Sequence, residues 1–383
     1  MSINVNEIGA AGNSALNQTL RASGSDTSPA IVIPERRLLL ADDVLASMQA
    51  TVSSIMTVEE FRKLQEVIPF NEYLKRVSAN PNIVRTSAQR ALDMVIGGGR
   101  TKTLLDGEEI FIYNLFSNPP NPDDAISGNE KAIHDFAVEI GRAAKDDRRL
   151  ILLYGPVGSS KTTLVRNLFS GLERYSKTDD GQMFSLAWDL SGLENDPAFK
   201  SCGKGLVECQ IHEDPMHIIP IDKRRETFGK LNEFRKQEAG GALLPYSLYT
   251  KGGLCRCCDD IYRKLLIHHN GNTSEVLSRV KAKRFTLDSD RRQGLTFYGA
   301  KDEKGCKPAD LVGDINWRRL LETGSESDPQ TIEQRGQVLQ ANRGGCHLGE
   351  VLKLPKKCLT DYWMELKIEQ WNFSEFKFHL MLY

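Results

Sequence analysis

Residues 150–172 read LILLYGPVGSSKTTLVRNLFSGL, and this stretch decides the fold. The apolar run Leu150–Tyr154 is too short for a helix and predicts a buried β-strand. The segment after the glycine- and serine-containing turn carries apolar residues at helical spacing, which predicts a helix with one buried face. That face consists of Leu164, Val165, Leu168, Phe169 and Leu172. The stretch therefore predicts a strand, a loop and a helix in succession.

The loop between the predicted strand and helix has the spacing of a phosphate-binding loop, G-x-x-x-x-G-K-[ST], with Ser160 in place of the last glycine. Backbone N–H groups of such a loop cradle phosphates, Lys161 can reach the β- and γ-phosphates, and the Thr162 hydroxyl can hold Mg²⁺. The expected nucleotide site comprises Gly155, Pro156, Val157, Gly158, Ser159, Ser160, Lys161, Thr162 and Thr163. We expect ATP and Mg²⁺ as cofactors. The alternative is a Gly/Ser turn before a surface helix with an incidental lysine.

The rest of the chain predicts an α/β organisation around this loop. A second apolar run, Phe184–Leu190, predicts another strand of a parallel sheet, because short apolar strands alternate here with helices. Residues 1–55 are expected to be a disordered or poorly ordered tail, 56–145 a helical region, and 146–360 the core with a polar insertion at about 200–310. The apolar positions at helical spacing in the helical region are Phe61, Leu64, Ile68, Ala88, Ala91, Met94, Val95, Ile133, Phe136, Ala137 and Ile140.

The composition excludes several classes of protein. The 383 residues hold 50 Lys and Arg against 51 Asp and Glu, so no basic excess points to nucleic acid or to an anionic membrane surface. No apolar run approaches the ~18 residues that a membrane helix needs. The N-terminus lacks the basic and apolar regions of a secretory signal. We therefore expect a cytoplasmic protein without a membrane or nucleic-acid partner.

All eight cysteines follow residue 200, and two of the segments that contain them have metal-ligand spacing. Cys209-x-x-His212 and Cys255-x-x-Cys258 supply thiolate and imidazole groups that suit tetrahedral Zn²⁺. We expect a structural zinc site that links two distant segments of the insertion. The alternative is a set of reduced core residues, and Cys202 or Cys257 could replace one of the ligands. The cysteines without an evident partner, expected as buried small hydrophobes, are Cys306, Cys346 and Cys358.

Seven stretches resemble, in the same order, the AAA-type ATPase region of the PrkA serine protein kinase family. They are FNEYLKRVSANPNIVRTSAQRALDM (70–94), LLYGPVGSSKTTLVRNL (152–168), CQIHEDPMHIIP (209–220), KGGLCRCCDDIYRKLL (251–266), FYGAKDEK (297–304), GDINWRRL (313–320) and QANRG (340–344). Ser160 is a variant that this family also carries. The resemblance implies a P-loop ATPase core of AAA type followed by a kinase-like region. It also implies serine protein kinase activity on a protein substrate, and a homo-oligomer.

The chain departs from the family pattern directly after QANRG. In sequences that resemble this family, ANRG is followed by two apolar residues, Glu-Phe, an apolar residue and Glu. This chain instead reads GCHLGE at 345–350. His347 replaces the first acid, and Gly345 and Gly349 weaken the strand that is expected here. Glu350 keeps the second acid and is the candidate catalytic partner of Lys161, holding Mg²⁺ or positioning water. A solvated carboxylate is the alternative for Glu350.

A second departure is that the family's sensor strand, helical lid and kinase-like region do not follow Leu354. Residues 361–383 are instead rich in aromatic side chains. They are either a novel packing element or the tail of a truncated or frameshifted reading frame, and we expect the truncation. The main expectation is thus an ATP-binding domain that hydrolyses ATP poorly. The alternatives are a non-catalytic nucleotide-binding or scaffold fragment, and an AAA-type remodelling or protease-linked ATPase.

Overall fold

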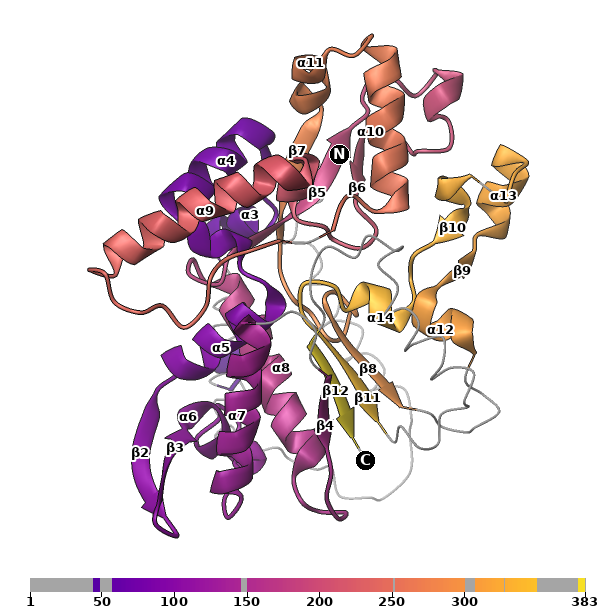
Figure 1. The fold of residues 1–383 in the computed structure, drawn as a ribbon. Coiled ribbons are helices and arrows are strands. Elements are labelled where there is room, and N and C mark those ends of the chain that lie inside the picture. Colours follow the sequence, from indigo (N-terminus) through magenta and orange to yellow (C-terminus); the bar gives the residue numbers. More distant parts are fainter. Residues whose placement is uncertain are drawn as a thin grey trace, which may run out of the picture. The chain divides into compact units, whose positions relative to one another are not determined.

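The computed structural model describes residues 44–48, 57–145, 150–250, 252–299, 307–326, 328–349 and 378–382 (Figure 1). The chain divides into two compact units, Met1–Glu60 and Phe61–Tyr383, and the elements from β1 onward belong to the second. Within the expected tail 1–55, residues 44–48 are helical, and the remainder lies outside the described residues.

A four-stranded parallel sheet carries the phosphate-loop segment (Figure 1). Its strands are β4 (Leu150–Leu153), β12 (Phe378–Leu382), β11 (Gly345–Gly349) and β8 (Leu295–Gly299), in that order across the sheet. Each neighbouring pair is parallel. The strand expected at Leu150–Tyr154 is therefore present as β4, one residue shorter than expected.

The register of the parallel sheet brings the end of β11 level with the start of the phosphate loop. Leu348 of β11 is opposite Met381 of β12, and Met381 is opposite Leu152 of β4. Because carboxyl ends of parallel strands meet at one edge of a sheet, Gly349 ends its strand at the edge where β4 gives way to Gly155. The residue that follows Gly349 in the chain is Glu350, which lies outside the described residues.

A second sheet of four strands is antiparallel and has the order β1-β7-β5-β6. Its strands are β1 (Val67–Pro69), β7 (Val280–Phe285), β5 (Met183–Asp189) and β6 (Leu206–Glu208). The run predicted as a strand at Phe184–Leu190 is thus β5, but its assignment to the parallel sheet was wrong. A continuous apolar run shows that a strand is buried and does not show the direction of its neighbours.

Four amphipathic helices account for much of the core. They are α4 (Phe70–Ala79), α5 (Ser87–Gly97), α7 (Glu130–Lys145) and α8 (Lys161–Lys177). The helical faces predicted for the last three are confirmed, since every apolar residue assigned to them is buried. The predicted stripe that ends at Ile68 was wrong, because Ile68 belongs to β1 and Phe61 is exposed.

The region expected to be helical, 56–145, also contains a hairpin of β2 (Arg100–Leu105) and β3 (Glu108–Tyr113). Its turn is Asp106–Gly107, and both residues have positive φ, 50° and 83°. Such a turn matches the right-handed twist of the two strands. Asp-Gly between two β-prone runs is a hairpin signal, so the sequence did contain this element.

The other described elements complete the chain between these sheets and helices in sequence order. They are α3 (Val58–Leu64), η2 (Pro81–Val84), α6 (Asn114–Ser117), η3 (Pro122–Asp124), η4 (Pro197–Phe199), η5 (Pro215–Ile218), α9 (Ile221–Glu238), α10 (Arg256–His268), α11 (Thr273–Ser278), α12 (Pro308–Val312), β9 (Asp314–Ile315), α13 (Trp317–Thr323), η6 (Pro329–Thr331), β10 (Ile332–Glu333) and α14 (Gln337–Gln340). Each 3₁₀ helix in the described part of the chain, labelled η, begins with proline, whose fixed φ suits a first helical position.

Two features of this arrangement bear on the expected domain boundaries, which stay predictions. The range of about 200–310 includes β8, which pairs with β11 in the parallel sheet, so an insertion there has to end before Leu295. Within 361–383, the described residues 378–382 form β12 between β4 and β11. For these five residues the placement agrees with a packing element, and the expectation for 361–377 lies outside the described residues.

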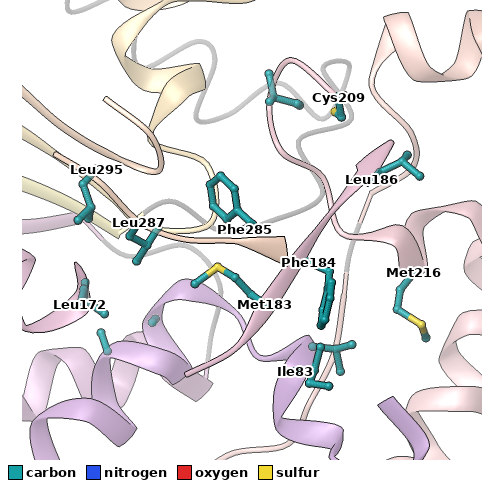
Figure 2. Packing of buried hydrophobic residues seen from close by; sticks show 14 of the residues in the cluster. Ile83, Leu172, Met183, Phe184, Leu186, Cys209, Met216, Phe285, Leu287 and Leu295 are labelled. Carbon is teal, nitrogen blue, oxygen red and sulfur yellow. The ribbon is translucent and has the colours of Figure 1, made fainter. Parts of the chain in front are cut away.

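One hydrophobic core runs beneath both sheets. Figure 2 shows Met183 of β5 toward Phe285 of β7 and Leu287, with Leu295 of β8 beyond Leu287, whereas Phe184 lies beside Ile83. These side chains are at most 3% exposed. Burial of a side chain of this size contributes about 1.5–3 kcal/mol, so the core ties the antiparallel sheet to the parallel sheet.

A buried ion pair also connects the two sheets. Arg343, just before β11, donates through Nη1 to Asp214 Oδ2 at 2.8 Å, and neither side chain is exposed. Asp214 lies after β6 and also accepts hydrogen bonds from the Tyr73 hydroxyl at 2.5 Å and the Met216 N–H at 2.8 Å. A buried carboxylate needs such partners, because transfer of a bare charge out of water is very unfavourable.

We expect Arg343→Met to lower the free energy of unfolding by about 3–5 kcal/mol, because it leaves the Asp214 carboxylate buried without its cation. Urea unfolding followed by circular dichroism measures this loss. Arg335→Met is the matched control, since the ion pair of Arg335 with Glu333 is at the surface and should change stability by less than about 1 kcal/mol. Equal losses in the two variants would contradict the importance of the buried pair.

Candidate functional site

The phosphate-loop segment joins the end of β4 to the first residue of α8. Gly155–Ser160 form the loop, and Val157 at its tip is fully exposed. Gly158 has φ +86°, a conformation that side chains with a Cβ rarely adopt. The loop is thus an exposed turn at the carboxyl edge of the parallel sheet, the edge where ligands of open α/β sheets bind.

Lys161 folds over this turn. Its Nζ donates to Gly155 O and Pro156 O at 2.7 Å each and to Ser159 Oγ at 3.1 Å. The ammonium is therefore held directly at the loop whose N–H groups would receive phosphates. Carbonyl oxygens are exchangeable partners for an ammonium, so the same side chain can turn to a phosphate oxygen.

The amino end of α8 supplies further donors. Leu164 is the first residue whose N–H bonds back along the helix, to Ser160 O at 2.9 Å, so the preceding N–H groups have no intrahelical acceptor. Those groups and the helix dipole favour an anion at this end. Thr162 is exposed and Thr163 is half-buried. The loop and helix thus fit a phosphate chain, with the Thr162 hydroxyl free to face solvent.

Ser160, the departure from the glycine pattern, takes the conformation that glycine usually supplies. It has φ +58° and ψ +15°, and its side chain makes no capping hydrogen bond to α8. A left-handed conformation costs about 1–2 kcal/mol for a residue with a Cβ. The loop therefore keeps its shape with serine and holds some backbone strain there.

We expect Ser160→Gly to stabilise the chain by about 1 kcal/mol, because glycine adopts this conformation without the Cβ penalty. Ser160→Ala is the control, since alanine keeps the Cβ and Ser160 has no capping hydrogen bond to lose. Thermal unfolding measured by calorimetry compares the two. A gain with alanine equal to that with glycine would show that the serine hydroxyl, and not the backbone conformation, sets the cost.

The strand before Glu350 carries none of the acids expected from related sequences. His347 is buried in β11, where its ring makes an edge contact with Phe297 at 5.4 Å between centroids. Burial lowers the pKa of His347 to about 4, so the ring is neutral at pH 7. A neutral buried imidazole cannot stand in for a carboxylate that holds Mg²⁺, and Glu350 itself lies outside the described residues.

The expected zinc ligands are only partly brought together. Cys209, Cys255 and Cys258 converge, but the fourth member of the group is Glu213 in place of His212. His212 has φ +53°, and its ring stacks on Phe285 at 4.5 Å between centroids. The geometry therefore does not agree with His212 as a ligand. The sequence signal for Glu213 is its position four residues after Cys209, in the pattern Cys-x-x-x-Glu.

The other cysteines lie apart from this group. Cys257 donates to Pro329 O at 3.2 Å, and Cys202 lies 3.5 Å from Lys264 Nζ. Cys346 is fully buried in β11, as expected for a small hydrophobe. Cys306 and Cys358 lie outside the described residues.

A strand, a phosphate-type loop and a helix at the carboxyl edge of a parallel sheet are the features that define the P-loop class of α/β proteins. Comparison with known families is more specific. Residues 68–370 match the family model described as the PrkA AAA domain, and the chain belongs to this family. Its fold is therefore the α/β fold of P-loop NTPases.

The chain is also similar to a protein named ATP-dependent protease PrkA from Bacillus subtilis (strain 168). The two are 28% identical over 328 residues, which are 84% of this chain and 43% of the relative. The chain thus spans less than half of the relative's length. The relative's printed name is that of a protease, so it does not support the kinase activity that the sequence led us to expect. No solved structure matches.

Of the helices that the structure describes, none combines the length and apolar character that crossing a bilayer requires.

Proposed function

We propose that this chain is an ATP-binding module of AAA type, which binds Mg·ATP through Gly155–Thr163. The observation that carries the proposal is the position of the Lys161 ammonium, within 3.1 Å of three loop oxygens and beside the free N–H groups of α8. Anions bind where N–H groups and a fixed cation converge. The parallel sheet would then be the AAA-type core. The antiparallel strands β5, β6 and β7, which lie between β4 and β8 in the chain, would belong to its insertion, and β1 would join them from the N-terminal side.

Each loop residue has a separate task in this proposal. Lys161 turns from its carbonyl partners to the β- and γ-phosphates, and the N–H groups of Gly158–Ser160 and of the first turn of α8 receive the other phosphate oxygens. Thr162 offers its exposed hydroxyl to Mg²⁺, which screens the phosphate charge when bound. Glu350, next in the chain after β11, is proposed to hold Mg²⁺ or position water.

We expect Lys161→Ala to weaken binding of a fluorescent ATP analogue at least about 100-fold. A charge-assisted hydrogen bond from the lysine ammonium to phosphate contributes about 2–3 kcal/mol to binding. Fluorescence titration at constant Mg²⁺ measures the change. Lys177→Ala is the control, since this exposed lysine ends the same helix far from the loop along the chain.

An unchanged affinity in Lys161→Ala would contradict the proposal. Thr162→Ala separates the metal from the phosphates: we expect it to weaken binding in Mg²⁺ and to leave binding in excess chelator unchanged, because only the metal contact is removed.

The fate of the γ-phosphate distinguishes two activities. The family resemblance favours transfer to a serine hydroxyl, whereas the name of the Bacillus subtilis relative favours ATP hydrolysis that drives proteolysis. We propose hydrolysis as the activity of this module, with a slow rate. The weakened acid strand supports the slow rate, because Gly345, neutral His347 and Gly349 leave Glu350 as its remaining acid. Homo-oligomers, a protein substrate and a cytoplasmic location stay predictions.

We expect γ-labelled ATP to yield inorganic phosphate slowly and no labelled serine in a generic acceptor protein, because the chain offers a phosphate loop and a single candidate acid. Glu350→Gln should bind ATP with unchanged affinity and hydrolyse it at least about tenfold more slowly than the unaltered chain. Glu326→Gln, which changes an exposed acid, is the control and should leave both ATP affinity and turnover unchanged. Labelled phosphoserine that disappears in Lys161→Ala would establish the kinase instead.

A further inference from the structure

A buried group of three thiols and one carboxylate lies apart from the phosphate loop. Cys209 follows β6, Glu213 precedes η5, and Cys255 and Cys258 lie at the start of α10. Their ligand atoms all lie within 4.8 Å of one another, and each residue is at most 4% exposed. Two segments that are distant in sequence are thus brought together around four potential metal ligands.

Two of the distances within the group are close to those of a tetrahedral zinc site. Cys209 Sγ lies 3.9 Å from Cys255 Sγ and 3.4 Å from Glu213 Oε2. Bonds of about 2.3 Å to sulfur and about 2.0 Å to a carboxylate oxygen separate tetrahedral ligands by about 3.5–3.8 Å. For Cys209, Cys255 and Glu213, a single ion therefore requires shifts of only a few tenths of an ångström in these two distances.

The charge of Glu213 also requires explanation. Among the described residues, no cationic side chain forms an ion pair with Glu213, whereas the adjacent and equally buried Asp214 is paired with Arg343. A carboxylate that is buried without a cation is very unfavourable. A divalent ion at the centre of the group would compensate the carboxylate directly.

Hydrogen-bond donors surround the group on the side of α10. The Cys255 N–H donates to Glu213 Oε1 at 2.6 Å, the Cys258 N–H donates to Cys255 Sγ at 3.4 Å, and Trp188 Nε1–H donates to Cys258 Sγ at 3.4 Å. Sulfur accepts hydrogen bonds best as thiolate, and metal ligands are commonly oriented by such contacts. The amino end of α10 favours the same negative charge.

We propose that Cys209, Glu213, Cys255 and Cys258 bind one structural zinc ion per chain. The three thiolates and the carboxylate fill a tetrahedral shell, which leaves no open position for a substrate. Zinc, rather than magnesium, matches a group dominated by sulfur. This proposal does not depend on nucleotide binding, because the group contains none of the loop residues.

The ion would shape a loop that anchors β11. Gln210 O accepts from Gln340 Nε2 at 3.2 Å, and Ile211 O accepts from Asn342 Nδ2 at 2.6 Å. These contacts lie between Cys209 and Glu213, so ligands at both ends of the segment fix its course. The anchored residues precede Gly345 and thus meet the amino edge of the parallel sheet, opposite the phosphate loop. Loss of zinc should therefore lower the free energy of unfolding and have a smaller effect on the phosphate-loop contacts.

Metal analysis of the purified full chain tests the proposal. After growth with added zinc and dialysis against a weak chelator, we expect one zinc ion per chain, and loss of most of it in Cys258→Ser and Glu213→Gln, because each removes a ligand. Cys257→Ser is the matched control, because Cys257 is adjacent and buried but its thiol faces Pro329 O. His212→Gln should keep its zinc, since His212 stacks on Phe285.

Cobalt substitution tests the wild-type chain without relying on any variant that fails to fold. Co²⁺ bound by three thiolates gives intense visible bands and thiolate-to-cobalt charge-transfer absorption. Both should disappear when added Zn²⁺ displaces the cobalt. A chain that holds no zinc and takes up no cobalt would overturn the proposal. So would a Cys209–Cys255 disulfide found by mass spectrometry in freshly purified protein, or the absorption of an iron–sulfur cluster.

Discussion

The contact between Asp214 and Arg343 constrains the rest of the structure, because two full charges meet where neither reaches solvent. Asp214 belongs to the loop that leaves the antiparallel sheet, and Arg343 directly precedes β11 of the parallel sheet. In a medium of low dielectric constant, separation of the pair would leave both charges without water. The distance between these two segments is therefore fixed within narrow limits. The Tyr73 hydroxyl extends the same constraint to α4, so helix, loop and strand share one polar centre.

Helices were predictable here because their periodicity is local. Leu168 and Ile140 repeat with their neighbours at a helical interval, and the structure buries those faces against the core. The partners of β5 were not predictable, since an apolar run such as Met183–Asp189 fits a buried strand of either direction. Phe378–Leu382 was missed for a different reason. Its strand character depends on the two strands beside it, which are distant in sequence.

The candidate sites show the same division between local and non-local information. The spacing of Gly155, Lys161 and Thr162 identified the phosphate loop because consecutive residues form it. Spacing also found three of the four residues in the thiol group. It selected His212 because two-residue spacing is common among metal ligands, but a left-handed backbone at His212 turns that ring to Phe285 and leaves the place to Glu213. Backbone conformation at one residue thus decided the composition of the group.

The position of β12 has a consequence for how the chain is made. A ribosome synthesises β4, β8 and β11 before β12, yet β12 pairs with β4 on one side and with β11 on the other. Until Phe378–Leu382 emerge, the nascent chain exposes two strand edges with unpaired N–H and C=O groups. Such edges pair readily with other chains, and distant pairings form slowly. Unpaired edges of β4 and β11 favour aggregation of the nascent chain, and a chaperone that holds this chain would protect it until β12 completes the sheet.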